Sequence, residues 1–427
     1  METGADATVL SAGSATCDPF APGFDAGLVS KDVLETLILD QLDGFGLVGE
    51  REEGSGEVVV SRAALIRFLR ELRDMYNDTL DFHNFHHAFT VFAVSAKVVH
   101  AILDAAASEG EDRHDGIRPK PPLRPVHVLA ILLAALCHDV DHPGHSNAFL
   151  NSTRTSNDAS DAGVSIRPHP LATRHGDKTA SVIEAHHVEV TNELLGVRPR
   201  EFGEKEKATT SGDVPLTGGL LSSLNKADAD YTVKLVEHAI MGTDLAVHRS
   251  LVQKLQLLGE CLDSANVLGF DQKNGERMHS VIDQKPLEER IEAAVGEDFY
   301  FVVTQAILHA ADLSNPTLNF DTCAAWSLRL SEEFKSNQMR EENWRQCKDI
   351  ETTAGGSRRP ITDVRGNHVP NLTEKLLPLA KGEKGFVEGV MLPYWTALAK
   401  VFPALECHVT RVKETVDTYA AIAKQSE

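Results

Sequence analysis

The stretch VHVLAILLAALCHDVDHPGHSN, residues 126–147, determines the predicted fold class and points to the chemistry. Val126–Leu136 is apolar on every side, which is typical of a helix at the centre of a large domain. Directly after this segment come His138 and Asp139, which can bind a metal ion together, and His142 follows four residues later. The next two residues are a Pro-Gly pair that ends a helix. We therefore expect metal ligands at the rim of a buried helix.

Similar helical patterns, with apolar residues three and four apart, recur along most of the chain. They predict helices at about 31–42, 64–72, 84–103, 126–136, 179–195, 228–260, 285–311, 321–347 and 386–423. The polar, Gly-containing segments 107–124, 151–178, 199–222 and 351–374 are predicted to be loop insertions. Strand signals are nearly absent, with Val58–Val60 as the one short candidate. The predicted fold is therefore all-α, a compact multi-helix domain with loop insertions.

Composition limits the function classes. The formal net charge of −21 argues against binding a nucleic acid polymer or an anionic membrane, but does not exclude a small anionic substrate. The longest apolar run, Val128–Cys137, is shorter than the ~20 residues of a membrane span, and no secretory signal is visible. Six scattered cysteines without a CxxC pair indicate reduced thiols, so we expect a cytoplasmic protein without a transmembrane segment.

Domain organisation follows from the same patterns. Residues 1–30 are rich in Ala, Gly, Ser, Thr and Asp, and are predicted to be a disordered N-terminal segment. Residues 31–427 are predicted to form one catalytic domain.

Histidines are concentrated in one part of the chain. Thirteen of the nineteen lie between His83 and His187, which indicates a metal site there. His83 and His87 are four residues apart and are expected to share one helix face. Asp312 follows another apolar helix and precedes a Ser-Asn-Pro break. Each of these features alone is more often structural, but a His, a separate His-Asp pair and a distant Asp, in that order at helix ends, are together far less frequent by chance.

That order resembles the HD-type metal phosphohydrolases. Further matches narrow the resemblance to the catalytic domain of the class I 3′,5′-cyclic-nucleotide phosphodiesterases, over about residues 65–415. The segments that carry it are His83-Asn-x-x-His-Ala88, His138-Asp-Val-Asp-His-Pro-Gly-x-x-Asn147, Glu184-x-His-His187, Thr243-Asp244 with His248, and Ala311-Asp-Leu-Ser-Asn-Pro316.

The resemblance implies hydrolysis of a cyclic nucleotide, cAMP or cGMP, to the nucleoside 5′-monophosphate by two divalent metal ions. The first metal, expected to be zinc because its ligands are two nitrogens and two oxygens, would be bound by His87, His138, Asp139 and Asp312. Asp139 would also bridge to a second ion, Mg²⁺ or Mn²⁺, and a bridging hydroxide would attack the phosphate. His83 would protonate the leaving oxygen as general acid. The residues expected to order metal-bound waters are His142, Asn147, Glu184, His187 and Thr243.

The implied base pocket departs from the family pattern. Phe386 and Leu330 would hold the base between them, with Asn315 nearby, while Glu383 stands where the family has a glutamine. An ionised carboxylate only accepts hydrogen bonds, whereas an amide both donates and accepts. Segment 335–374 also lacks the family's usual Ile-Ser-Pro sequence. The preference between cAMP and cGMP therefore stays open, as do regulation and oligomeric state.

Two alternatives remain from the sequence. The chain could be another HD-type phosphohydrolase that acts on nucleoside phosphates, although the His83-Asn84 pair and Ala311–Pro316 weigh against this. It could instead be a catalytically degenerate scaffold that binds a nucleotide or a partner protein, which Glu383 and segment 335–374 would favour. A substrate panel and zinc analysis would discriminate among these classes.

Overall fold

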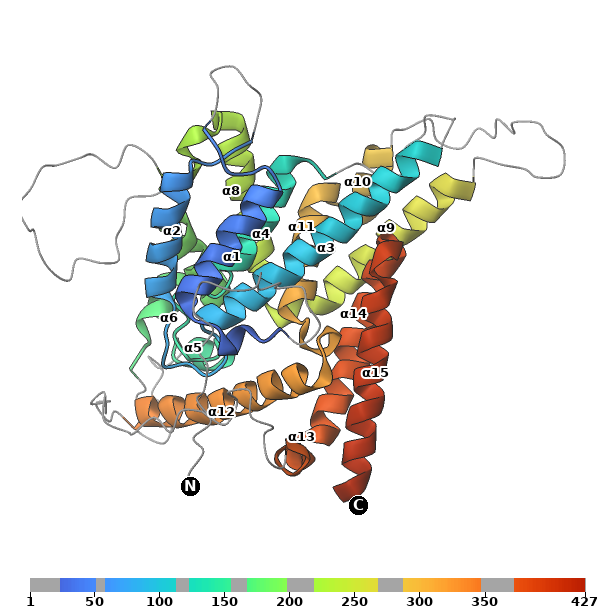
Figure 1. Cartoon of the computed structure of the whole chain (residues 1–427). Coiled ribbons are helices and arrows are strands. Elements are labelled where there is room, and N and C mark those ends of the chain that lie inside the picture. Colours follow the sequence, from blue (N-terminus) through green and yellow to red (C-terminus); the bar gives the residue numbers. More distant parts are fainter. Residues whose placement is uncertain are drawn as a thin grey trace, which may run out of the picture.

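The computed structural model describes residues 24–50, 58–112, 123–154, 167–197, 219–267, 287–346 and 372–426. Helices make up nearly all of this part of the chain, which confirms the predicted all-α fold (Figure 1). The α-helices are α1 Lys31–Gly44, α2 Arg62–Met75, α3 Phe85–Asp112, α4 Pro125–Cys137, α5 Asn147–Ser152, α6 Pro170–His175, α7 Val182–Leu194, α8 Lys226–Met241, α9 His248–Val267, α10 Leu287–Val295, α11 Phe299–Asp312, α12 Phe320–Arg345, α13 Leu372–Phe386, α14 Leu392–Val401 and α15 Glu406–Ala423. Among the described residues, the predicted strand Val58–Val60 is reduced to an isolated parallel bridge between Val48 and Val60.

Helix α4 lies at the centre of the fold, as its apolar sequence predicts. Every residue from Val126 to Cys137 is buried, and the helix packs against α3, α8 and α11. Pro125 occupies its first turn, where the missing N–H costs nothing and the fixed φ favours a helical start. The surrounding hydrophobic core draws on residues from Ala26 near one end of the chain to Ile422 near the other.

Helix α3 is 28 residues long and crosses much of the molecule in Figure 1. Its segment Phe85–Ser108 is the one described helix that is long and apolar enough to span a membrane. Two thirds (67%) of its most apolar window is buried inside the protein, as expected of a core helix. Polar residues interrupt this segment in the sequence, so it contains no long continuous apolar run.

Three predicted helical spans are interrupted. Span 228–260 is divided into α8 and α9 at Gly242, after which the Asp244 side chain caps a short 3₁₀ turn by accepting from the Ala246 N–H. Span 285–311 is divided into α10 and α11 at Gly296, whose φ of 76° is a conformation that favours glycine. Span 386–423 contains a π-helical turn, Val387–Met391, and then a break between α14 and α15 at Pro403.

The loop prediction for 151–178 is partly wrong, since residues 170–175 form α6 and residues 151–152 end α5. The loop prediction for 107–124 is wrong at its start, because α3 continues to Asp112, and the prediction for 351–374 is wrong at its end, because α13 begins at Leu372. Most of the remaining residues of these insertions, and residues 1–23 of the N-terminal segment, lie outside the described residues. Residues 24–30 contact the core, where Ala26 is buried and the Phe24 ring lies 5.8 Å from that of Phe89.

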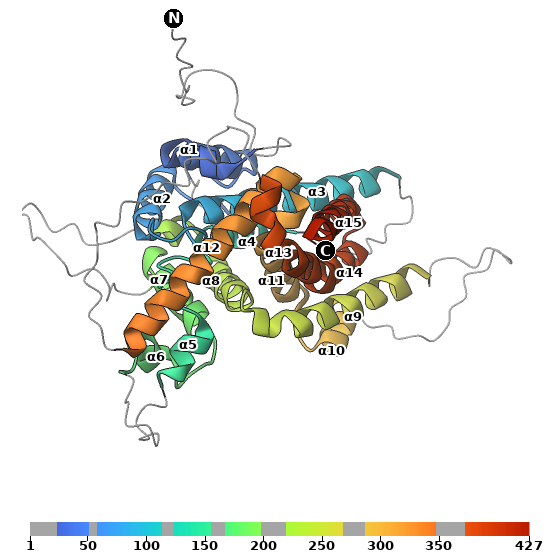
Figure 2. The same ribbon diagram turned by 90° about the horizontal axis from the view of Figure 1, so that it is seen from below.

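The remaining helices flank this centre. Helix α12 crosses one side of the molecule, and α13, α14 and α15 form a group beside it (Figures 1 and 2). Helices α5, α6 and α7 share a small separate core of Phe149, Leu150, Ala172, Val182 and Ile183. The four described cysteines, Cys137, Cys261, Cys323 and Cys407, are free thiols.

Candidate metal centre and active site

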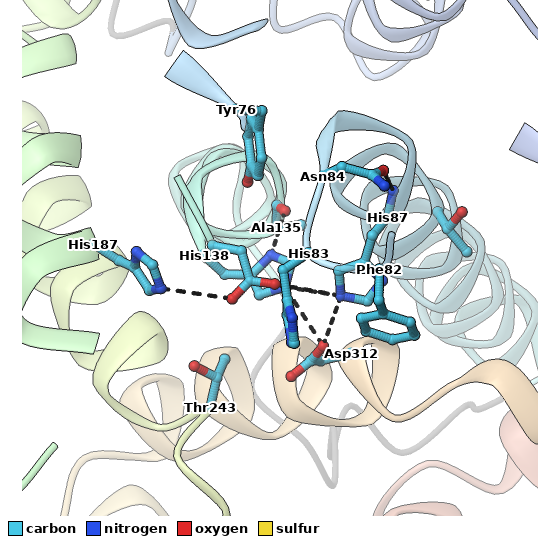
Figure 3. Close-up of polar contacts among 12 residues, drawn as sticks. Tyr76, Phe82, His83, Asn84, His87, Ala135, His138, His187, Thr243 and Asp312 are labelled. Carbon is cyan, nitrogen blue, oxygen red and sulfur yellow. Dashed lines mark hydrogen bonds and ion pairs between the residues drawn. The ribbon is translucent and has the colours of Figure 1, made fainter. Parts of the chain in front are cut away.

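Four predicted metal ligands meet where three core helices begin or end. His87 lies in the first turn of α3, His138 caps the end of α4 with Asp139 beside it, and Asp312 is the last residue of α11 (Figure 3). Asn84 starts α3, because its side-chain oxygen accepts from the N–H groups of His86 and His87. We call these four ligand candidates the metal tetrad.

The side-chain atoms of the tetrad converge on one point. His138 Nε2 lies 3.3 Å from His87 Nε2, 3.1 Å from Asp139 Oδ2 and 3.5 Å from Asp312 Oδ1. His87 Nε2 lies 3.1 Å from Asp312 Oδ1 and 3.5 Å from Asp139 Oδ2. Two atoms bound to the same zinc ion at about 2.0–2.2 Å in tetrahedral geometry lie about 3.3–3.6 Å apart, and these five separations are of that size. The arrangement therefore fits a metal ion.

Burial and missing hydrogen bonds support the same conclusion. His87, His138 and Asp139 are buried, and among the described residues Asp139 Oδ2 has no hydrogen-bond partner. A buried carboxylate oxygen without a partner is costly unless a cation binds it. Burial raises the pKa of Asp312, but hydrogen bonds and charges from His138 and His87 outweigh this and hold it well below its ordinary value. Asp312 is therefore ionised, the form that binds a metal.

The end of α4 is fixed by hydrogen bonds to its last carbonyl groups. His138 Nδ1 donates to the Ala135 carbonyl at 3.0 Å, so the ring presents Nε2 to the site. The Tyr76 hydroxyl donates to the Leu136 carbonyl at 2.8 Å, and the Val140 N–H donates to the Cys137 carbonyl at 3.1 Å. These bonds hold the His-Asp pair in place.

Two predictions that a pair of histidines four residues apart lies on one helix are wrong, namely those for His83 with His87 and for His138 with His142. His83 precedes α3, which begins at Phe85, so His83 and His87 do not share a helix face. Helix α4 ends at Cys137, and His142 follows a turn in which Asp141 adopts a φ of 57°. His142 and His83 nevertheless meet, because their rings stack with centroids 4.2 Å apart.

A buried carboxylate that the sequence did not reveal holds His83. Glu333 on α12 is fully buried, pairs with His83 Nδ1 at 2.5 Å, and accepts from the N–H groups of Phe82 and His83. Burial lowers the pKa of His83, but the charges of Asp139 and Glu333 and the Glu333 hydrogen bond raise it to about 9. The His83 ring is therefore protonated near neutral pH.

The other polar residues predicted near the metals form a second group. His187 Nδ1 donates to the Val140 carbonyl at 2.7 Å, and its Nε2 lies 3.7 Å from Asp139 Oδ1 (Figure 3). Asn147 donates to Glu184 at 2.8 Å, and burial raises the pKa of that carboxyl to about 7.

Thr243, the last predicted member of that group, donates its hydroxyl to the Ile240 carbonyl at 2.8 Å, at the end of α8. The interpretation of Asp244 as a helix cap is confirmed by its bond to the Ala246 N–H.

The predicted base-binding residues lie on α12, α13 and the turn after α11. Glu383 Oε2 accepts from the Ser327 hydroxyl at 2.9 Å, and Ser327 Oγ lies 3.0 Å from the Tyr419 hydroxyl. Burial raises the pKa of Glu383. Ser327 follows Trp326, whose ring lies 5.8 Å from that of His87, so α12 connects Glu383 with the tetrad.

The partners Ser327 and Tyr419 were not identified from the sequence. The half-buried side chains of Asn315, Leu330 and Phe386 complete the predicted set.

Comparison with known proteins identifies the family. The family model described as 3′5′-cyclic nucleotide phosphodiesterase matches residues 82–412. A probable 3′,5′-cyclic-AMP phosphodiesterase of Caenorhabditis elegans is 25% identical over 367 residues, covering 84% of this chain and 40% of that protein. A cGMP-specific 3′,5′-cGMP phosphodiesterase of Dictyostelium discoideum is 22% identical over 403 residues, covering 94% of this chain and 64% of that protein. The chain thus spans less than two thirds of the length of these relatives.

Solved structures show the same fold. The phosphodiesterase domain of a rhodopsin fusion protein from the choanoflagellate Salpingoeca rosetta superposes with a TM-score of 0.59 at 22% identity, over 94% of this chain and 95% of that one. The structure of LmjPDEB1 in complex with IBMX gives a TM-score of 0.60 at 18% identity, over 96% and 93% of the two chains. Because the matched region, residues 82–412, covers most of the sequence and contains the whole metal tetrad, the chain belongs to the 3′5′-cyclic nucleotide phosphodiesterase family.

Proposed function

We propose that this chain hydrolyses a 3′,5′-cyclic nucleotide, cAMP or cGMP, to the nucleoside 5′-monophosphate. The observation that carries the proposal is that the ring nitrogens of His87 and His138 lie 3.1–3.5 Å from both aspartates and from each other, beside the protonated ring of His83. Membership of the family supports the substrate class. Residues 31–427 would act as one catalytic domain.

The tetrad would hold the first metal ion, and its two imidazoles and two carboxylates suit zinc. Asp139 Oδ1, on the His187 side, would reach a second ion, for which a mainly water-bound site suits Mg²⁺ or Mn²⁺. When bound, these ions would supply Lewis acidity that stabilises charge on the phosphoryl oxygens and makes water more acidic. His142, Asn147, Glu184, His187 and Thr243 would orient water molecules around the second ion.

His83 would donate a proton to the departing ribose 3′-oxygen. Because Glu333 accepts from Nδ1, the opposite nitrogen, Nε2, carries the proton that can be transferred. The raised pKa of His83 keeps this proton in place near neutral pH. Stacking on His142 and the buried carboxylate of Glu333 fix the plane of the ring, so the acid is oriented before substrate binds.

The base would lie between Leu330 and Phe386. Phe386 is three residues after Glu383 and therefore projects from nearly the same face of α13. Leu330 is three residues after Ser327 on α12, and the Ser327–Glu383 bond joins the two helices at this point. Asn315 lies three residues after Asp312, at the site's edge.

Turnover assays test the proposal. Purified protein is incubated with cAMP or cGMP in the presence of Mg²⁺ or Mn²⁺, and the products are separated by chromatography. We expect 5′-AMP or 5′-GMP as the product. If both cyclic nucleotides remain intact while a nucleoside triphosphate is hydrolysed, the chain is another type of phosphohydrolase. No turnover of any substrate, together with no bound zinc, would identify a catalytically inactive scaffold.

A further inference from the structure

A second group of possible metal ligands lies outside the tetrad. His175 ends α6, while His186 and Glu189 lie one turn apart on α7 and share a helix face. One ligand atom from each of the three lies within 4.8 Å of the others. His175 is 5% exposed and His186 is 2% exposed, so two imidazoles and a carboxylate meet inside the protein.

The state of His175 is unusual for a simple structural histidine. Its Nε2 is buried and lies 3.2 Å from Glu189 Oε2, yet among the described residues it has no hydrogen-bond partner. A buried ring nitrogen without a hydrogen bond is costly, and a cation bound between it and the nearby carboxylate would offset that cost. Burial lowers the pKa of His175 to about 4, so the ring is neutral, as a metal ligand must be.

His186 is oriented by a carboxylate. Its Nε2 lies 2.9 Å from Asp141 Oδ2, in the turn that follows the catalytic His-Asp pair. Metal-bound histidines are commonly oriented by such a carboxylate partner. The left-handed backbone of Asp141, with a φ of 57°, directs this side chain toward α7. The adjacent His187 contacts Val140 and Asp139 instead, so the two neighbouring histidines bind different residues.

Arg174 offers a competing explanation for Glu189. Its guanidinium makes two hydrogen bonds to this carboxylate, at 2.6 and 2.7 Å. Charge–charge attraction alone would therefore hold the half-buried Glu189 in this position. However, a carboxylate has about four lone-pair positions, and two bonds from arginine leave room for a metal ion. The salt bridge also does not account for the unpartnered Nε2 of His175.

We propose that His175, His186 and Glu189 form a structural zinc site that is separate from the catalytic centre. Two nitrogens and one carboxylate oxygen are ligands that zinc prefers, with His186 binding through Nδ1 because its Nε2 contacts Asp141, and water would complete the tetrahedron. The site would join the end of α6 to α7. Together with α5, these helices otherwise share a core of five buried apolar residues among those the structure describes. A metal ion bound to both α6 and α7 would therefore stabilise their contact substantially.

Zinc content tests the proposal. The full chain, as wild type, His175→Gln and Glu189→Gln, is equilibrated with Zn²⁺ alone and freed of loosely bound metal by gel filtration. We expect both variants to hold one zinc ion fewer per chain than the wild type. The matched control is His100→Gln on α3, whose ring stacks on Phe45, and it should keep the wild-type zinc content. Equal zinc in all four proteins would overturn the proposal.

A second experiment separates the two metal sites. In a His138→Ala background the tetrad lacks one ligand, so most of the remaining tightly bound zinc should belong to His175, His186 and Glu189. This protein should still bind zinc, and added Zn²⁺ should raise its thermal unfolding temperature. Adding His175→Gln should abolish both effects. A His138→Ala protein that neither binds zinc nor is stabilised by it would contradict the proposal, even if the His175 variants do not fold.

Discussion

The metal tetrad and the base-binding residues differ in how firmly the fold holds them. His87 and His138 are at most 1% exposed, and they extend from the ends of helices that form the centre of the core. Leu330, Glu383 and Phe386 are half-buried, and a hydrogen bond from the Ser327 hydroxyl ties Glu383 to α12. Under the proposed function, the phosphate chemistry would be built into the core, whereas base selection would depend on a few adjustable side chains.

Removing one tetrad ligand should have the largest effect. Asp312→Asn takes away a charged ligand, and a catalytic metal ion supplies several kcal/mol of stabilisation, so kcat/KM should fall by about a thousandfold or more. Zinc content should fall with it. Asp230→Asn, an exposed carboxylate paired with Lys226, is the matched control and should retain full activity. An active Asp312→Asn protein would mean that the tetrad is not the catalytic centre.

Replacing the proposed acid should have a smaller effect. His83→Gln should lower kcat by about 10²–10⁴-fold, the usual contribution of general acid catalysis, while zinc content stays unchanged. His86→Gln is the control, because His86 contacts the Val29 carbonyl outside the tetrad. Unchanged kcat in the His83 variant would rule out its role as proton donor.

Glu333→Gln should change the pH dependence of turnover. The charge of Asp139, together with the hydrogen bond and charge of Glu333, raises the pKa of His83 to about 9, so the acid keeps its proton until the pH rises through that value. Loss of the carboxylate lowers this pKa, and the alkaline decline in kcat/KM should begin at lower pH. At pH 8 we expect roughly a tenfold loss. The control is Glu332→Gln, which removes the adjacent half-exposed carboxylate and should leave the pH profile unchanged. If the pH profiles of Glu333→Gln and the wild type coincide, Glu333 does not raise the pKa of His83.

Glu383→Gln should have the smallest effect and should act on selectivity rather than on chemistry. An amide can both donate to and accept from a purine edge, whereas the carboxylate only accepts. We expect the ratio of kcat/KM values for cAMP and cGMP to change by about tenfold, with zinc content and the pH profile unaltered. Glu388→Gln, which removes an exposed carboxylate paired with Lys384, should leave the ratio unchanged. An unaltered ratio in Glu383→Gln would exclude this residue from base recognition.

The parts of the site that the sequence revealed are those with a local signature. His138 and Asp139 are adjacent, and each tetrad residue marks the start or end of an apolar helix, so periodicity indicated these positions and the family resemblance selected them as ligands. Glu333 could not be found in this way. It lies in a stretch of α12 rich in charged residues, and it is buried where it accepts hydrogen bonds from the N–H groups of Phe82 and His83, just before α3. Its burial is a tertiary effect without a sequence pattern.

The all-α fold was predicted correctly, but the lengths of some helices were not. Helical periodicity continues across Gly242 and Gly296, so the sequence predicts longer helices than the structure contains. The start of α3 was closer to prediction, since Asn84 is a favourable cap residue and does cap the helix.

The direction of the two helices that end at the tetrad has an electrostatic consequence. Both α4 and α11 finish there, at Cys137 and Asp312, so the negative ends of two helix dipoles face this point, against the one positive end of α3. With two ionised aspartates and a chain that carries a net charge of −21, this point should attract cations and repel a phosphate. Under the proposed function, the nucleotide would therefore bind well only after the ions have reversed the local field. This predicts an ordered sequence of binding, with metal first and substrate second.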